Sequence, residues 1–174
     1  MRGILFILFV GMLTSSSAQL YVLKDHRPDS AERYNVLYDS LPALADTFFR
    51  AFITSDLSNM KPFVPQLKYL KATLDTAAVE YREEQAVYRQ QLLLRSLQKE
   101  YKKALKYAQK KDIKVHKLAR GKTDFDYTKD EKENTFCYVT EHLTRRKHEY
   151  ALKYLAIQLN GNWFVGNKLT FEEL

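Results

Sequence analysis

The last quarter of the chain alternates between apolar and polar side chains with the two-residue period of a β-strand. One alternating run covers residues 147–159, and a second covers residues 162–171. Between them lies Asn160-Gly161, the dipeptide most typical of a type I′ turn, because both turn positions need a positive φ angle. The pattern predicts a β-hairpin, with the single tryptophan, Trp163, placed soon after its turn.

Shorter alternating runs precede this hairpin. Residues 113–119 and 123–127 alternate on either side of Gly121, and residues 135–143 alternate before a basic tight turn at 144–146. A glycine inside a strand pattern is typical of a bulge or a bend. We therefore predict four consecutive strands with short connections, which form an antiparallel meander.

The first half of the chain has the three-and-four spacing of amphipathic helices. Ser40 is the predicted N-cap of a helix that tolerates Pro42 in its first turn and extends its apolar stripe to Phe52. A short helix is expected at 57–61. The stretch 66–111 lacks glycine and proline, and we expect one or two long helices there, packed on the sheet.

Helices followed by strands predict an α+β fold, in which N-terminal helices pack on a curved four-stranded antiparallel meander sheet. A chain of 174 residues is long enough for one domain with its own core. We expect this domain to cover 40–174. A polar lead-in at 19–39, with a short helix at 29–38, would precede it.

The N-terminus has the pattern of a signal peptide. Met1-Arg2 supplies a positive charge, residues 4–13 form an apolar run too short to span a bilayer, and small residues lead to Ala18. We predict cleavage after Ala18 and export to the periplasm or the outside of the cell, although an uncleaved anchor remains an alternative. Cleavage would remove Arg2 and lower the formal net charge from +7 to +6.

Two segments resemble the NTF2-like superfamily of cone-shaped α+β proteins. The first is the helix end and break at 51–57; the second is the final hairpin with Asn160-Gly161, Trp163 and the sequence at 165–169. The layout is similar to exported domains of this superfamily in Bacteroidetes, although a cystatin-like sheet wrapped on a helix would have a similar pattern. The resemblance implies the fold and no single activity, since the superfamily includes isomerases, dehydratases, transport adaptors and binding modules.

Motifs with a known chemistry are missing from the sequence. It has no glycine-rich phosphate loop, no paired-histidine zinc helix and no Cys-x-x-Cys pair. Asp124 and Asp126 share one strand face beside a charged loop and are expected to face water. The single cysteine, Cys137, lies in an apolar run and is expected to be a buried small residue. We assign no catalytic residue, no cofactor and no metal ligand, including among the histidines His26, His116, His142 and His148.

Basic residues are concentrated between 99 and 122. Lys99, Lys103, Lys106 and Lys110 share one face of the predicted helix. This face either binds an anionic partner, such as an acidic glycan or lipid headgroups, or is a solvated helix surface. Nucleic acid is not expected as a partner, because export removes the chain from the cytoplasm.

Aromatic residues mark a second candidate surface. Tyr150 and Tyr154 share one face of the predicted hairpin, and Trp163 lies close by. Because both faces of this strand are fairly apolar, we expect either a homodimer through the sheet face or a pocket for a small apolar ligand.

Two functions from different classes remain at this stage. The sequence favours an exported, noncatalytic binding or interaction module. The alternative is a small cofactor-free acid/base enzyme of the isomerase or dehydratase type, which would need a carboxyl or a histidine pointing into the cone beside a tyrosine donor.

Overall fold

The structure is a computed structural model, and it describes residues 37–55, 57–74, 79–130 and 134–174. These residues belong to one compact unit, Tyr34–Leu174. The predicted signal peptide, its cleavage after Ala18 and nearly all of the expected helix at 29–38 lie outside the described residues. None of the described helices is long and apolar enough to cross a membrane.

Helices make up the first half of the described chain, as predicted. They are α2 (Leu41–Thr54), η2 (Leu57–Phe63), α3 (Leu67–Ala72) and α4 (Val79–Lys110), where η marks a 3-10 helix. Ser40 is the N-cap of α2, and Pro42 lies in its first turn. The helix ends at Ser55, whose left-handed backbone (φ 55°) lets its N–H donate to the Phe52 carbonyl. The stretch 66–111 contains two helices, one short and one long.

The second half forms one open antiparallel sheet. Its elements are η3 (Val115–Lys117), β1 (Ala119–Lys129), β2 (Thr135–Arg145), β3 (His148–Leu159) and β4 (Asn162–Glu173). The strands lie side by side in the order β1-β2-β3-β4. The α+β class and the four-stranded meander are therefore confirmed.

One predicted strand segment is wrong. Residues 113–118 contain η3 and no strand, and β1 begins only at Ala119. Ile113, Val115 and Leu118 are nevertheless buried. The spacing of these three residues fits a 3-10 turn packed against the core, and it fits a strand equally well. The apolar pattern alone therefore could not distinguish the two.

Two local features of the sheet follow the prediction. Asn160 and Gly161 both have a positive φ angle, 49° and 79°, as a type I′ turn requires. The pairing of β1 with β2 shifts by one residue between Arg120 and Thr123, which places a bulge at the predicted Gly121. The bulge turns Arg120 and Thr123 toward the same face of the sheet.

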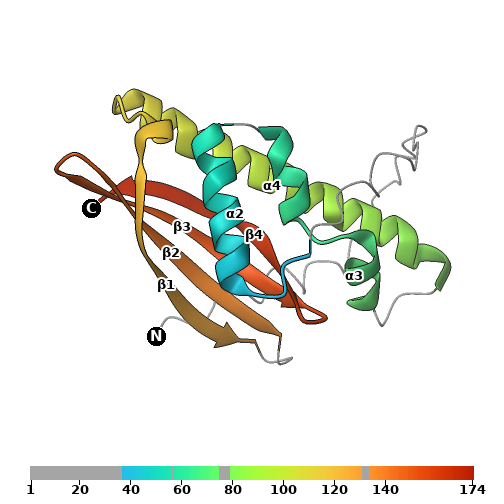
Figure 1. Ribbon diagram of the computed structural model, residues 1–174. Coiled ribbons are helices and arrows are strands. Elements are labelled where there is room, and N and C mark those ends of the chain that lie inside the picture. The colour runs from blue at the N-terminus through green and yellow to red at the C-terminus, as the bar shows by residue number, and fades with distance from the viewer. Residues whose placement is uncertain (1–36, 56, 75–78, 131–133) are drawn as a thin grey trace, which may run out of the picture. The chain divides into compact units, whose positions relative to one another are not determined.

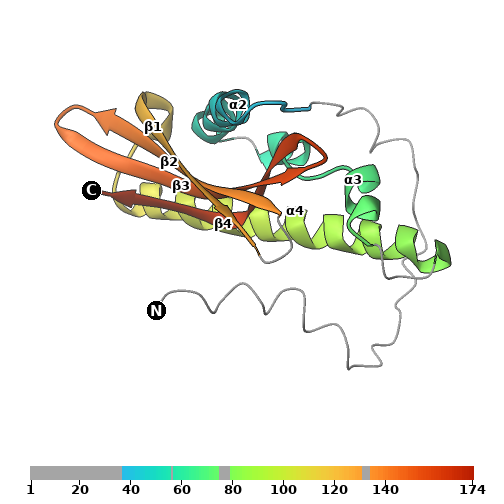
Figure 2. The same cartoon turned by 90° about the horizontal axis from the view of Figure 1, so that it is seen from below.

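Helix α2 crosses the face of the sheet toward which Arg120 and Thr123 point, which we call the inner face. Helix α4 runs along the edge strand β4 (Figures 1 and 2). The core between them is rich in aromatic rings. Phe52 of α2 contacts Tyr101 of α4 and Phe171 of β4, with ring centroids 5.7 and 5.4 Å apart. The Tyr101 hydroxyl also donates to the carbonyl oxygens of Ala51 and Phe52, so α4 is hydrogen-bonded to the last turns of α2.

Trp163 fastens the entry of α2 to the hairpin. The backbone N–H of Trp163 donates to the backbone carbonyl of Tyr38 at 2.8 Å. This bond forms an isolated bridge between β4 and the segment before α2. The ring of Trp163 contacts Tyr127 of β1 with centroids 6.0 Å apart. Through Trp163, the predicted hairpin therefore contacts both the segment before α2 and the first strand of the sheet.

The outer face of the sheet is partly covered within the chain itself. Phe164 is fully buried and contacts the ring of Tyr69 in α3. Leu155 is only 2% exposed, and it lies against Gly166, where a Cβ would approach the Leu155 carbonyl to 3.1 Å. Tyr138 of β2, on the same face, is 41% exposed, and the homodimer stays a prediction.

The turn at Gly161 can be tested by substitution. We expect Gly161→Ala to lower the free energy of unfolding by about 1 kcal/mol, because alanine resists a positive φ angle. No atom lies within 4 Å of a Cβ built there, so crowding does not contribute. The measurement is urea denaturation, with Gly161→Asn as the control, since asparagine tolerates this backbone better. Equal losses in both variants would contradict the explanation.

Candidate functional site

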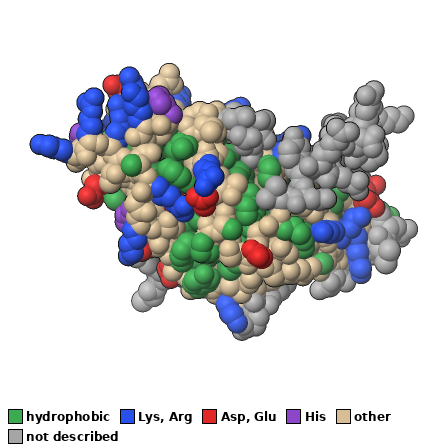
Figure 3. All heavy atoms as spheres, in the orientation of Figure 1, with side chains coloured by type: hydrophobic (Ala, Val, Ile, Leu, Met, Phe, Trp, Pro, Cys, Tyr) green, Lys and Arg blue, Asp and Glu red, His purple; other side chains and the backbone are tan. Residues whose placement is uncertain are grey.

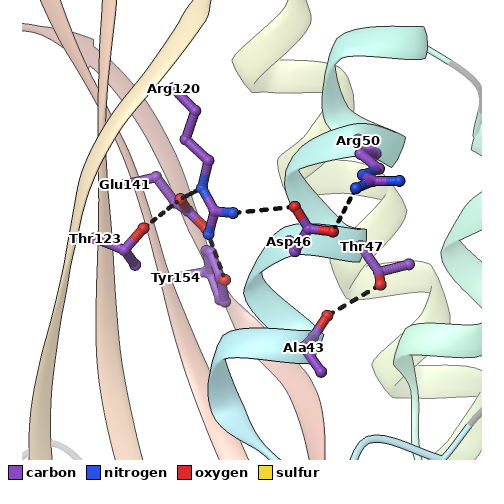
Figure 4. A network of polar contacts seen from close by, with 8 residues as sticks. All are labelled: Ala43, Asp46, Thr47, Arg50, Arg120, Thr123, Glu141 and Tyr154. Carbon is purple, nitrogen blue, oxygen red and sulfur yellow. Dashed lines mark hydrogen bonds and ion pairs between the residues drawn. The ribbon is translucent and has the colours of Figure 1, made fainter.

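Glu141 is the only charged side chain that is buried among the described residues. It lies on β2, at a position that faces α2, and its exposed fraction is 0%. Figure 4 shows its carboxylate beside side chains from β1 and β3, with Asp46 of α2 on the far side of Arg120. A buried carboxylate is stable only when donors replace its lost water.

Three side chains supply those donors. Arg120 donates from Nε to one carboxylate oxygen of Glu141 at 2.6 Å and from Nη2 to the other at 3.0 Å. The hydroxyl of Thr123 donates to the first oxygen at 2.9 Å, and that of Tyr154 donates to the second at 3.3 Å. The bulge in β1 is essential here, because it lets Arg120 and Thr123 reach the same carboxylate.

The network continues from the sheet to α2. The third nitrogen of Arg120, Nη1, donates to Asp46 at 3.3 Å, and Asp46 also pairs with Arg50 at 2.9 Å (Figure 4). The guanidinium of Arg120 lies over the ring of Phe49, 5.6 Å from its centroid. Asp46 is 45% exposed, and it links α2 to the sheet through Arg120.

This arrangement contains the side chains that an acid/base site needs, but a substrate cannot reach them. Both oxygens of Glu141 are occupied, and the side chain offers no surface to a substrate. Burial, and then the nearby negative charge of Glu141, raise the pKa of Tyr154 well above its ordinary value. Tyr154 therefore stays protonated as a donor to Glu141, and the network stabilises the packing of the sheet on α2.

The three aromatic residues proposed for a pocket or an interface lie in the core. Tyr150, Tyr154 and Trp163 are 4%, 2% and 5% exposed. Tyr150 stacks on Phe171, and Tyr154 contacts the ring of Phe48 at 4.7 Å. Their rings are occupied by contacts within the chain.

Asp124, Asp126 and His142 lie on the outer side of the sheet, whereas His148 lies on the same side as Tyr150 at the start of β3, and His116 lies in η3. Asp124 receives hydrogen bonds from Lys122 and His142, and the bond from Lys122 is the first cause of its lowered pKa. Asp126 is exposed, as expected. His148 pairs separately with Glu173 at 2.9 Å. Within the described ranges, no three His, Cys, Asp or Glu side chains gather as a metal site would require.

Cys137 is completely buried on the inner face of β2. Burial raises the pKa of its thiol to about 11, from an ordinary value of 9.0. Because the thiolate is the reactive form, Cys137 is a packed, unreactive side chain, as the sequence indicated.

The basic face of α4, defined as Arg95, Lys99, Lys102, Lys103, Lys106 and Lys110, is exposed along its length. Lys103 pairs with Glu100 at 2.8 Å. Among the described residues, no carboxylate lies within ion-pair distance of Lys99, Lys102 or Lys106. Figure 3 shows Lys and Arg side chains gathered near the C-terminal end of α4, at the upper left.

A shallow hollow of about 480 Å³ lies on this basic face. It is lined by Gln98 and by all of the basic face except Lys110. A second hollow, of about 360 Å³, lies at the ends of α2 and α4 and includes Ser55, Asp112 and His116. Of these two hollows, only the first is lined by charged side chains of a single sign.

Comparison of the chain with protein-family models, with curated proteins and with solved structures gave no match. The functional argument therefore depends on the geometry of the chain itself.

The buried ion pair can be tested with a double-mutant cycle. We expect Arg120→Met to lower the free energy of unfolding by about 3 kcal/mol, because Glu141 is left buried and unpaired. The double variant Arg120→Met/Glu141→Leu should regain most of this loss, since no buried charge remains. Urea denaturation measures these two variants and the single variant Glu141→Leu, which completes the cycle. Additive losses would show that the two side chains are not energetically coupled.

The environment of Cys137 can be tested with a thiol reagent near neutral pH. The thiolate fraction should be about a hundredfold lower in the folded protein than in the unfolded chain, from the rise of its pKa from 9.0 to about 11. Labelling of the native protein should be slower by at least that factor than labelling in denaturant. Equal rates in the two states would mean that the thiol is not enclosed.

Proposed function

We propose that this chain is an exported, noncatalytic binding module of NTF2-like layout, and that the basic face of α4 binds an anionic partner. Export is supported by the N-terminal sequence pattern, and the NTF2-like layout by helices followed by an open antiparallel sheet. The observation that carries the proposal is the row of exposed cations on one side of α4, of which Lys99, Lys102 and Lys106 have no carboxylate within ion-pair distance among the described residues.

Helix stability does not account for these cations. A positive side chain interacts favourably with the helix dipole only within the last turn. Lys110 lies in that turn, whereas Arg95, Lys99 and Lys102 lie two turns or more before the helix ends at Lys110. Their charge is free to attract a partner from solution.

The closed interior favours binding over catalysis. The one buried carboxylate of the described residues is held by Arg120, Thr123 and Tyr154. An acid/base enzyme would need such a group to be open to its substrate. The exposed basic face therefore supports the binding module better than the interior supports the enzyme.

Charge neutralisation tests the proposal, with inorganic polyphosphate as a soluble polyanion. The triple variant Lys99→Gln/Lys102→Gln/Lys106→Gln should bind it about tenfold more weakly at low salt, because each exposed pair contributes up to about 1 kcal/mol. Added salt should weaken binding by the original chain. Fluorescence anisotropy with labelled polyphosphate gives both dissociation constants.

A matched control removes the same charge elsewhere. Lys61, Lys68 and Lys147 are exposed and lie on other elements of the fold. Their triple change to glutamine should leave polyphosphate binding nearly unchanged. If both triple variants weaken binding equally, net charge alone explains it and the basic face has no special role.

A further inference from the structure

The solvent-facing side of α4 carries more than charge. Alternating four- and three-residue steps place six exposed side chains in one line, which we name the outer stripe: Tyr88, Leu92, Arg95, Lys99, Lys102 and Lys106. Tyr88 is 58% exposed and Leu92 is 37% exposed. Residues three and four apart lie one above the other on a helix, so the stripe is continuous over about 27 Å at about 1.5 Å per residue.

The opposite side of α4 is fixed in the core. Leu97, Tyr101, Ala104 and Ala108 are all at most 4% exposed and pack toward the sheet and α2. Because this side is committed to the fold, the helix cannot rotate to bury Tyr88 or Leu92. The fold holds two apolar side chains and four cations in one row toward solvent.

We infer, on the basis of the proposed function, that the partner of the outer stripe is an anionic lipid surface. Helices that lie on membranes combine Lys and Arg with aromatic or leucine side chains. Tyrosine is also favoured at the membrane interface, where its ring is apolar and its hydroxyl is hydrated. A soluble polyanion would use the cations and would gain little from Leu92.

The shape of the surface agrees with an extended partner. The hollow on the basic part of the stripe is shallow and is lined mainly by long basic side chains. It therefore has no enclosed subsite that would select one small anion. Long lysine side chains can reach headgroup phosphates while their aliphatic stems cover apolar surface, so a flat lipid surface would engage the whole row.

Charge on the neighbouring turns limits the stripe to this part of α4. Glu84 is exposed one turn before Tyr88, on the same side of α4. A carboxylate is repelled by an anionic surface. The docking surface therefore begins at Tyr88 and extends toward the C-terminal end of the helix.

Vesicle binding tests the inference. The protein is the chain from Gln19, which contains the whole compact unit Tyr34–Leu174 and lacks the apolar run at 4–13. Sedimentation compares vesicles of phosphatidylcholine alone with vesicles of equal parts phosphatidylcholine and phosphatidylglycerol. We expect binding to the acidic vesicles that weakens with salt, and little binding to the neutral ones.

Two sets of variants separate charge from apolar contact. Lys99→Gln/Lys102→Gln/Lys106→Gln should lower partition to acidic vesicles about a hundredfold, since each basic residue contributes about fivefold. Tyr88→Ser/Leu92→Ser should lower it about tenfold and leave polyphosphate binding unchanged. The control is Lys61→Gln/Lys68→Gln/Lys147→Gln, and thermal unfolding of each variant verifies that it is folded.

The outcomes distinguish this inference from the proposed function. Binding to polyphosphate without binding to acidic vesicles would overturn the lipid inference and leave an anionic partner of another kind. Binding to neither probe would overturn both. Equal binding to neutral and acidic vesicles, or unchanged vesicle binding by Tyr88→Ser/Leu92→Ser, would also overturn the lipid inference.

Discussion

A carboxylate that is fully withdrawn from water needs compensating donors, and this requirement organises the sheet around Glu141. The uncompensated cost is several kcal/mol, a large part of the stability of an ordinary domain. Arg120 and Thr123 can meet it together only because the bulge between them turns both side chains inward. Arg120 then reaches Asp46, so the same pairing fixes the place of α2 on the sheet.

Because Glu141 is enclosed in the core, partner molecules can reach only the outer surface of the fold. Glu141 is enclosed by donors, and aromatic rings fill the space beneath α2. Among the described residues, the Tyr38 hydroxyl is the one buried side-chain polar atom without a hydrogen-bond partner. A binding site is therefore sought on the surface. The longest of the described elements is α4, and one of its sides is fixed in the core. The side of α4 that stabilises the fold and the side that we propose to bind a partner are therefore opposite each other.

Local patterns were sufficient to predict most of the fold. The hairpin turn, the start of α2 and the bulge at Gly121 each depend on a few neighbouring residues, so the sequence indicated them directly. The Glu141 network joins residues 21 positions apart across a bulge, and no local rule gives that pairing. A signal was present, because Glu141 shares the buried alternation of Val139 and Leu143, and an ionisable residue at such a position needs a partner.

The basic face shows the limit of the same reasoning. Spacing on a helix predicted a shared face for its lysines, but only the structure shows which of the described cations lack a carboxylate and that Tyr88 and Leu92 continue their row. Like charges three or four residues apart destabilise a helix by a few tenths of a kcal/mol per pair. Arg95, Lys99, Lys102 and Lys106 form three such pairs in succession. A long helix whose stability comes from its buried side can carry this cost, and binding of an anionic surface would relieve it.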